Sequence, residues 1–271
     1  MNGMGRRLVF VTLVLAFSSC SILGGKGCSS IRWKRAPTDD RCPGPLPEGR
    51  EVPWLAYPRH SHYSYMSLGE WCRRVQSHLS DPVRNKAKLV FLGDSITQLW
   101  KEVAPDVWQE HFVKHSPLLL GIGGDQTQQI LWRIERGELD GLDPGVVVLL
   151  IGVNNLIISR ATPEDTARGV RAVNAAVRDR LPRARILHLA LFPAGETPSD
   201  WLRQKIEKTN ALLQDLANNP NVVFLDFGPR FLSADGMLST EIMDDFLHPS
   251  RQGYVVWAHA LDPLLAKWLA R

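Results

Sequence analysis

The 271-residue sequence lacks the patterns that mark several common kinds of functional site. No group of His, Cys, Asp and Glu has the spacing of a metal site, and no phosphate-binding loop is present. The lone Gly123-Gly124 pair is not a dinucleotide fingerprint, and neither an internal repeat nor a low-complexity tract occurs. The sequence therefore predicts an activity that depends on no metal and no cofactor.

Excess charge is also missing from most of the chain. The formal net charge of +4 comes entirely from residues 1–49, and residues 50–271 carry equal numbers of basic and acidic side chains. A neutral globular part without a basic stripe gives no support for nucleic-acid binding. We expect a small molecule as the partner of the globular part, and no nucleic acid.

The apolar run at the N-terminus, Leu8–Phe17, is too short to span a membrane comfortably. Two arginines precede it, and this order is typical of an export signal. The residues up to Cys20 resemble a bacterial lipoprotein cleavage box, with Phe17 where Leu is usual. We expect residues 1–19 to be a signal peptide and Cys20 to be the lipidation candidate of an exported, membrane-tethered protein. Cleavage after Ser18, which would give a secreted or periplasmic protein, and an uncleaved anchor are the alternatives.

Cysteine is scarce, with four residues in the chain. Apart from Cys20 these are Cys28, Cys42 and Cys72, whose spacing does not resemble a zinc site. An exported protein can form disulfides, and with Cys20 lipidated at most one bridge can form among the other three. Buried or unpaired thiols without chemistry are the alternative.

The composition changes near residue 60. Residues 20–60 are rich in Gly, Ser, Pro and charge, which is typical of a tether rather than a core. We expect the globular domain at residues 61–271, starting with a helix near Ser67. Strands are then expected at 88–92, 118–121, 146–151, 185–191 and 222–226, and helices at 105–114, 126–136, 163–181, 200–217 and 250–268.

This alternation predicts the fold class. Five short, nearly continuous apolar strands separated by helices indicate a parallel sheet that is covered on both faces. The expected fold is α/β, a three-layer α/β/α sandwich around a five-stranded parallel sheet. Ligands of such open sheets bind at the carboxyl ends of the strands.

A candidate nucleophile stands at the end of the first expected strand. Ser95 lies in Gly-Asp-Ser-Ile-Thr, directly after an apolar run, and Asp245 and His248 lie three residues apart near the C-terminus. A serine, a histidine and a carboxylate can act as nucleophile, base and orienting group in acyl transfer to water. Each piece alone is weak, because Gly-Asp-Ser is an ordinary turn and Ser is also a good helix cap.

Donors for an oxyanion follow the next two expected strands. Gly124 lies in a glycine loop, where backbone N–H groups can approach a ligand closely, and Asn154 offers a side-chain NH2 group. With the backbone N–H of Ser95, these groups are the candidate oxyanion hole of a serine hydrolase. The alternative for Asn154 is a turn, which suits Asn well.

Neighbouring residues compete for two of these roles. Asp244 could replace Asp245 as the orienting carboxylate, although Asp245 has the better spacing from His248. Asp94 is expected to hold the turn beside the nucleophile, because it adjoins Ser95 too closely to orient the base. Structural roles are also expected for three further residues, Asn155 in a turn, Asp125 as a helix cap and Trp132 in packing.

The combined pattern of Ser95, Gly124, Asn154 and the Asp245/His248 pair resembles the SGNH subclass of GDSL-type hydrolases. The stretch from Gly121 to Leu139 is more similar still to the catalytic subunits of platelet-activating-factor acetylhydrolase Ib and their bacterial relatives. Many family members have Asn-Asp where this chain has Asn-Asn, and the acetylhydrolase-like branch shares Asn-Asn.

The resemblance carries expectations that composition and spacing do not. It implies a flavodoxin-like strand order and the catalytic and oxyanion roles just described. It also implies a preference for short acyl groups such as acetyl, on a sugar, a phospholipid or a small molecule, and it leaves a homodimer open. Two other functions stay as alternatives: a non-catalytic surface binding module on a hydrolase fold, and an acyltransferase that uses the same triad.

Overall fold

The computed structural model describes residues 42–44 and 46–270, and everything below refers to them. The expected signal peptide, the lipidation candidate Cys20 and the first half of the expected tether lie outside the described residues. One five-stranded parallel sheet forms the centre of this part, in the order β2-β1-β3-β4-β5. The strands are β1 (Leu89–Gly93), β2 (Pro117–Gly121), β3 (Val146–Leu150), β4 (Arg185–Leu189) and β5 (Val222–Leu225).

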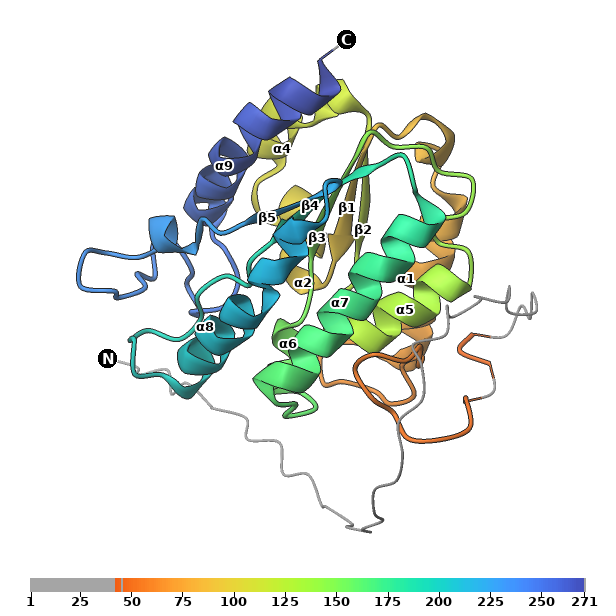
Figure 1. The fold of residues 1–271 in the computed structure, drawn as a ribbon, viewed down its shortest axis with the longest axis horizontal. Helices are drawn as coiled ribbons and strands as arrows, with labels where there is room; N and C mark the ends of the chain where they lie inside the picture. Colours follow the sequence, from red (N-terminus) through yellow and green to blue (C-terminus); the bar gives the residue numbers. More distant parts are fainter. Residues whose placement is uncertain (1–41, 45, 271) are drawn as a thin grey trace, which may run out of the picture. The chain divides into compact units, whose positions relative to one another are not determined.

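Helices cover both faces of the sheet, which confirms the three-layer α/β/α prediction (Figure 1). On one face α5 packs beside α7 and α7 beside α8, and on the other face α4 packs beside α9. The α-helices are α1 (Leu68–Ser80), α2 (Ser95–Gln98), α3 (Trp100–Val103), α4 (Pro105–His111), α5 (Thr127–Glu135), α6 (Val153–Ile157), α7 (Pro163–Arg180), α8 (Trp201–Leu213) and α9 (Arg251–Leu269).

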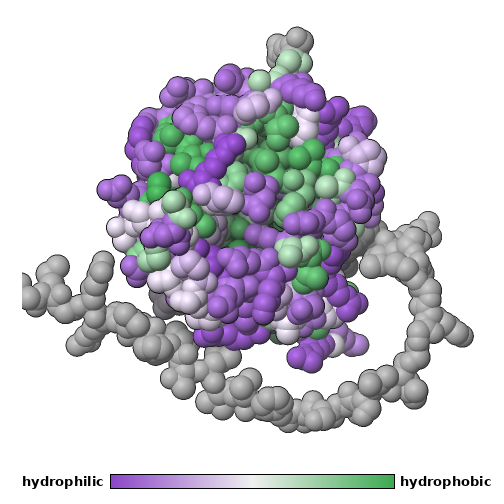
Figure 2. Space-filling model, turned by 60° about the vertical axis from the view of Figure 1, so that its left-hand side comes forward, coloured by the Kyte–Doolittle hydropathy of each residue, from purple (hydrophilic) through white to green (hydrophobic). Residues whose placement is uncertain are grey.

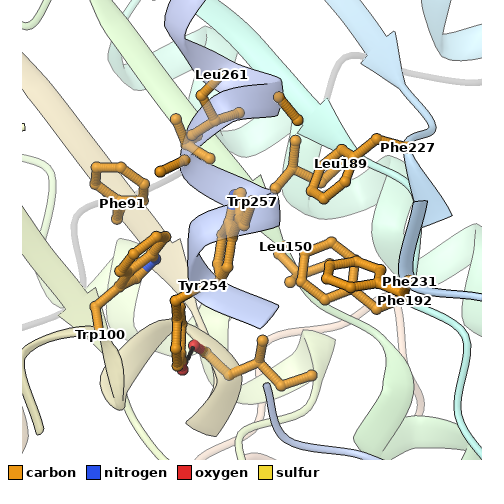
Figure 3. Packing of buried hydrophobic residues seen from close by; sticks show 14 of the residues in the cluster. Phe91, Trp100, Leu150, Leu189, Phe192, Phe227, Phe231, Tyr254, Trp257 and Leu261 are labelled. Atoms are coloured by element: carbon orange, nitrogen blue, oxygen red, sulfur yellow. Dashed lines mark hydrogen bonds between the residues drawn. The ribbon is translucent and has the colours of Figure 1, made fainter. Parts of the chain in front are cut away.

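The strands are apolar on both sides because each side meets a layer of helices. In β1, Phe91 faces the side of α9, where it meets Trp257 with 6.4 Å between ring centroids. Figure 3 shows this cluster of aromatic and aliphatic side chains around α9. Within it the Tyr254 hydroxyl donates to the carbonyl of Ile96 at 2.7 Å, so the cluster also holds the helix that follows β1.

Local signals account for the starts of the longer helices. The Thr162 side chain accepts a hydrogen bond from the Asp165 N–H, and Pro163 occupies the first turn of α7. The side chain of Ser250 accepts from two backbone N–H groups at the start of α9. This second cap sets the start of α9, and the cap residue Ser250 lies two positions after His248.

The segment before α1 packs on the domain. Pro53 O accepts a hydrogen bond from Thr127 Oγ1 at 2.6 Å, and the Tyr57 N–H donates to Gln128 O at 3.0 Å. A disulfide joins Cys42 to Cys72 of α1. The described end of the expected tether therefore differs from a free spacer, because buried polar contacts attach it to the start of α5.

Few large apolar side chains are exposed in the described part of the chain. Figure 2 shows one face, on which hydrophobic residues gather in patches bordered by hydrophilic residues. Within residues 42–270, no helix combines the length and the apolar character needed to cross a bilayer. The exposed large hydrophobic residues are Leu46, Leu55, Tyr65, Val113, Trp201 and Leu212.

Candidate active site

Ser95 is the first residue of α2, immediately after β1. The carboxylate of the preceding residue, Asp94, is fully buried and accepts from the Ile96 N–H at 3.0 Å, so it caps α2. This is the structural role that the sequence predicted for Asp94. Gly93 is required at the end of β1, because a Cβ there would collide with the Leu150 carbonyl of β3.

The loop before α9 holds Asp245 and His248 in a tight turn. Asp245 Oδ1 accepts from the N–H groups of Leu247 at 3.0 Å and His248 at 2.7 Å. Phe246, between them, has a φ of 59°, a left-handed conformation that residues other than glycine seldom adopt. The turn leaves Asp245 Oδ2 free to face the histidine ring.

The structure brings the three expected catalytic residues together. Ser95 Oγ lies 2.9 Å from His248 Nε2, and His248 Nδ1 lies 2.7 Å from Asp245 Oδ2. The His248 side chain is 28% exposed, so solvent and substrate can reach the pair. Asp244 has no hydrogen bond to the ring among the contacts of the described residues, so the geometry favours Asp245 as the orienting carboxylate.

The charges of this group are set by burial and by contact. Burial raises the pKa of Asp245, but the hydrogen bonds from the His248 side chain and backbone outweigh it and lower the pKa to about 2. Burial lowers the pKa of His248, whereas the hydrogen bond and charge of Asp245 raise it above the ordinary value of 6.5. At neutral pH, Asp245 is therefore an anion facing a histidine of raised basicity.

Two backbone donors near Ser95 have no acceptor within the described residues. They are the N–H groups of Ser95 and Gly124. Gly124 has a φ of 76°, which only glycine adopts without strain. The neighbouring Gly123 lies against the nucleophile, since a Cβ on Gly123 would stand 3.7 Å from Ser95 Cβ. The glycine loop after β2 therefore lies beside the nucleophile turn and contains a backbone N–H group without an acceptor among the described residues.

Asn154, at the start of α6, is the third expected donor and lies directly behind the nucleophile turn. Its Nδ2 donates to Asp125 O at 3.0 Å and to Asp94 Oδ2 at 3.3 Å. Burial raises the pKa of Asp94 to about 7, and the charge of Asp125 adds to this. The longer bond from Asn154 thus reaches a carboxyl group that gains a proton close to neutral pH.

Trp132 has the packing role expected from the sequence, whereas Asn155, expected in a turn, lies within α6 and has a structural role there. Asn155 Oδ1 accepts from the Thr127 N–H at 3.0 Å and so connects α6 to the start of α5, away from Ser95. Trp132 is buried and packs on Trp71, with 5.2 Å between ring centroids.

Asp125 differs from its expected role as a helix cap. The cap residue of α5 is Gln126, whose backbone N–H donates to Gln129 Oε1 at 3.0 Å. The Asp125 carboxylate instead accepts from Trp71 Nε1 at 2.7 Å and from Arg133 Nη1 at 2.7 Å. Full burial explains the difference, because a buried carboxylate needs charged and polar donors around it.

Sequence reasoning missed three residues that contact the glycine loop. Gln98 Oε1 accepts from the Gly123 N–H at 2.8 Å, and Arg59 donates to the Gly123 carbonyl at 2.7 Å. The Tyr65 hydroxyl lies against Gly124, where a Cβ would collide with it. Arg59 lies at the end of the proline-rich segment and Tyr65 just after it, and nothing in their local sequence indicates contacts with residues about 60 positions away.

Other titratable groups do not join the site. His188 of β4 is fully buried beside Asn174, and burial lowers its pKa to about 3, so it is neutral and structural. His111 pairs with Asp262 of α9 at 2.8 Å, on the helix layer. Within the described residues, no group of three or more His, Cys, Asp and Glu could hold a metal ion.

Solved structures of similar fold agree with this architecture. A GDSL-like lipase from Bacteroides thetaiotaomicron matches with a TM-score of 0.60 and 22% identity, covering 72% of this chain and 96% of that chain. At this level of identity the likeness shows the fold alone.

Proteins of similar sequence indicate the family as well as the fold. Platelet-activating factor acetylhydrolase IB subunit alpha1 from Homo sapiens is 38% identical over 204 residues, covering 75% of this chain and 86% of the relative. Subunit alpha2 from Rattus norvegicus is 36% identical over 200 residues, covering 73% of this chain and 85% of the relative. The model of the GDSL-like lipase/acylhydrolase family matches residues 91–256, which include all three residues of the Ser95–His248–Asp245 contact chain. The chain therefore belongs to the GDSL-like lipase/acylhydrolase family and is a carboxylic ester hydrolase.

Proposed function

We propose that this protein is a serine esterase that hydrolyses short-acyl carboxylic esters, above all acetyl esters, with Ser95 as the nucleophile. The observation that carries the proposal is the chain of contacts from Ser95 Oγ through the His248 ring to the Asp245 carboxylate, at 2.9 and 2.7 Å. An acceptor nitrogen beside a serine hydroxyl, oriented by a carboxylate, is the arrangement that activates serine for acyl transfer.

The reaction follows from these contacts. As Ser95 Oγ attacks the ester carbonyl, its proton passes to His248 Nε2, and the carbonyl oxygen becomes an oxyanion. The N–H groups of Ser95 and Gly124 stabilise that oxyanion, and Asn154 joins them when its bond to Asp94 is released. The imidazolium then gives the proton to the leaving alcohol, which leaves an acyl group on Ser95. Water repeats the sequence, so that the acid is released and Ser95 regains its proton.

The preference for acetyl esters is supported by the relatives, which are named acetylhydrolases. The alcohol part is a sugar, a phospholipid or a small molecule. A panel of p-nitrophenyl esters from acetyl to dodecanoyl, with acetylated sugars and an acetylated phospholipid, would define both parts of the substrate. Highest kcat/KM on the acetyl ester is expected, and a maximum at long acyl chains would contradict the short-acyl proposal.

Two further measurements separate this function from the alternatives. A fluorophosphonate should label Ser95, whereas a binding module would remain unlabelled. Added alcohols should leave the yield of free acid unchanged if water is the acceptor, and an acyltransferase would divert the acyl group to the alcohol. A homodimer stays open as an alternative to a monomer, and light scattering on the purified protein would distinguish the two by mass.

We also propose that the protein is exported and is held at a membrane by lipid on Cys20. The support is the sequence of residues 1–20 together with the disulfide between Cys42 and Cys72, since disulfides persist mainly in oxidising compartments. Mass spectrometry of the mature N-terminus should find an acylated Cys20. A soluble mature protein that starts at Ser19 would replace this proposal with simple secretion.

A further inference from the structure

Residues 46–66, which we call the N-terminal strap, precede the region that the family model matches and yet reach the glycine loop of the candidate site. Two contacts with the start of α5 hold the strap, at Thr127 Oγ1 and at the Gln128 carbonyl. The glycine loop contains Gly123 and Gly124, whose shared peptide group offers the candidate oxyanion donor. Arg59 connects the strap to that peptide.

Several contacts hold the two terminal nitrogens of Arg59, while its buried Nε has no hydrogen-bond partner among the described residues. Its side chain is 1% exposed, and its Nη2 donates to Gly123 O at 2.7 Å and to Asp125 Oδ1 at 3.1 Å. Its Nη1 contacts Met66 Sδ at 3.3 Å, and the guanidinium lies 4.3 Å from the centroid of the Tyr63 ring. Burial of a guanidinium is costly unless it is paired, so these contacts define one position for the side chain.

The bond to Gly123 O has a geometric consequence for Gly124. The Gly123 carbonyl and the Gly124 N–H belong to one planar trans peptide group, in which they point in opposite directions. Because Arg59 holds the carbonyl on the side of the strap, the N–H faces the other side. A Cβ on Gly123 would stand 3.7 Å from Ser95 Cβ and 3.5 Å from Met66 of the strap, so this peptide lies between the strap and the nucleophile.

A glycine pair needs such support. Glycine has no Cβ and visits positive and negative φ with similar ease, so a peptide between two glycines can rotate at low cost. Rotation would turn the Gly124 N–H away from the nucleophile and place a carbonyl oxygen near the oxyanion. On the other flank, Gln98 Oε1 accepts from the Gly123 N–H at 2.8 Å, which leaves the Gly123 carbonyl to be held by Arg59.

We propose that Arg59 is a positioning residue of the oxyanion hole: it locks the Gly123–Gly124 peptide so that the Gly124 N–H points at the developing oxyanion. The proposal rests on the proposed function and adds to it a residue outside the region of the family model. Arg59 touches neither Ser95 nor His248 among the described contacts, so it acts through the peptide.

The test compares Arg59→Met, which removes the charge and the donors, with Arg59→Gln, which keeps an N–H donor for the Gly123 carbonyl. Arg168→Met is the matched control, because Arg168 stacks on Trp54 of the same strap at 3.7 Å but is exposed and does not contact the glycine loop. Each variant is measured for kcat and KM on p-nitrophenyl acetate, for melting temperature, and for affinity toward a simple alkylboronic acid. The tetrahedral adduct of that acid with serine places a negative oxygen in the oxyanion hole.

Misplacing a catalytic donor by about 1 Å costs on the order of a hundredfold, so Arg59→Met should lower kcat about 10- to 100-fold with KM changed less than about threefold. Boronate affinity should fall in proportion, and Arg59→Gln should lie between Arg59→Met and wild type. Arg168→Met should lower the melting temperature without changing kcat or boronate affinity.

Three outcomes would overturn the proposal: a folded Arg59→Met protein with wild-type kcat and boronate affinity, an equal loss in Arg168→Met, or failure of both Arg59 variants to fold. The last would show that Arg59 serves the fold and not the oxyanion hole. Failure of the proposed function is seen separately, as absence of ester hydrolysis and of fluorophosphonate labelling in the wild-type protein.

Discussion

Asp94 Oδ2 and Asn154 Nδ2 lie 3.3 Å apart, directly behind the nucleophile turn. The same nitrogen donates to Asp125 O at 3.0 Å, so both of its protons have acceptors in this structure. An oxyanion in the site would compete with Asp94 for one of these protons. The longer, weaker bond to Asp94 is the one that we expect to give way.

Replacement of Asn154 by Ala tests this donor. Loss of one oxyanion donor costs about a hundred- to a thousandfold in kcat, and we expect Asn154→Ala to fall in this range with the fold retained. Steady-state kinetics on p-nitrophenyl acetate would measure it. A kcat within about threefold of wild type would show that the bonds to Asp94 and Asp125 are the whole role of Asn154.

Asn155→Ala is the matched control, because Asn155 is adjacent, buried and amide-bearing but faces α5. Loss of the Asn155 side chain leaves the Thr127 N–H without an acceptor. A buried unpaired donor lowers the free energy of unfolding by about 1–3 kcal/mol. We therefore expect lower stability in urea unfolding and nearly unchanged kcat. The reverse ranking of the two variants would assign the donor to Asn155.

Ser95→Ala should lower kcat by at least about a thousandfold, because no other group in the site supplies the attacking oxygen. The melting temperature should change little, since Asp94 rather than the Ser95 side chain caps α2. Fluorophosphonate labelling should disappear with the activity. Ester hydrolysis near the wild-type rate by the folded variant would exclude Ser95 as the nucleophile.

Much of the fold and of the candidate site could be predicted because the signals are local. Each strand is a short apolar run, and the residues that follow β1, β2 and β3 meet at one edge of the sheet, as parallel strands require. The expected order and layers are confirmed, and the strand boundaries agree within two residues. The contacts among Ser95, His248 and Asp245 follow from this topology.

The remainder depends on contacts that have no local signal. Helices α2, α3 and α6 have four or five residues, too few for a helical period to be detected. Arg59 contacts Gly123, which is 64 positions away in the sequence. The proline-rich composition around Arg59 predicts a tether and gives no sign of that contact. Burial of Asp125 makes its partners Arg59, Trp71 and Arg133 necessary, but burial at a loop position cannot be read from one sequence.

Gly124→Ala tests how closely the strap approaches the oxyanion donor. The added Cβ would collide with the Tyr65 hydroxyl and would stand 2.9 Å from a ring carbon of Tyr63, at a φ of 76°. We expect kcat to fall about a hundredfold or more through displacement of the donor. Adding Tyr65→Phe removes the nearest atom and should restore part of the loss.

Gly141→Ala is the control for backbone strain alone. Gly141 has a similar φ of 74°, and a Cβ there would meet nothing within 4 Å. It should lower stability by roughly 1–2 kcal/mol, the cost of a left-handed residue, and leave kcat unchanged. Equal kcat losses in the two variants would show that strain, and not the collision with the strap, inactivates the protein.

The pH profile reports the charge of His248, which must be neutral to accept the proton of Ser95. Burial lowers the pKa of His248, but the hydrogen bond and charge of Asp245, followed by the charges of Asp94 and Asp244, raise it above 6.5. Activity should therefore rise with pH, with a midpoint above 6.5 in kcat/KM. A midpoint clearly below 6.5 would contradict the contact between the His248 and Asp245 side chains.

Substitution of the two aspartates then assigns the cause. Asp245→Asn removes the charge and no longer holds the Nδ1–H tautomer, so we expect the midpoint to move to lower pH and kcat to fall by about 10⁴. Asp244→Asn removes only a neighbouring charge, because its carboxylate has no bond to the ring among the described contacts. It should move the midpoint slightly in the same direction with kcat retained. If Asp244→Asn instead caused the larger loss, the orienting carboxylate would be Asp244, and the turn at Asp245 would serve only to shape the loop.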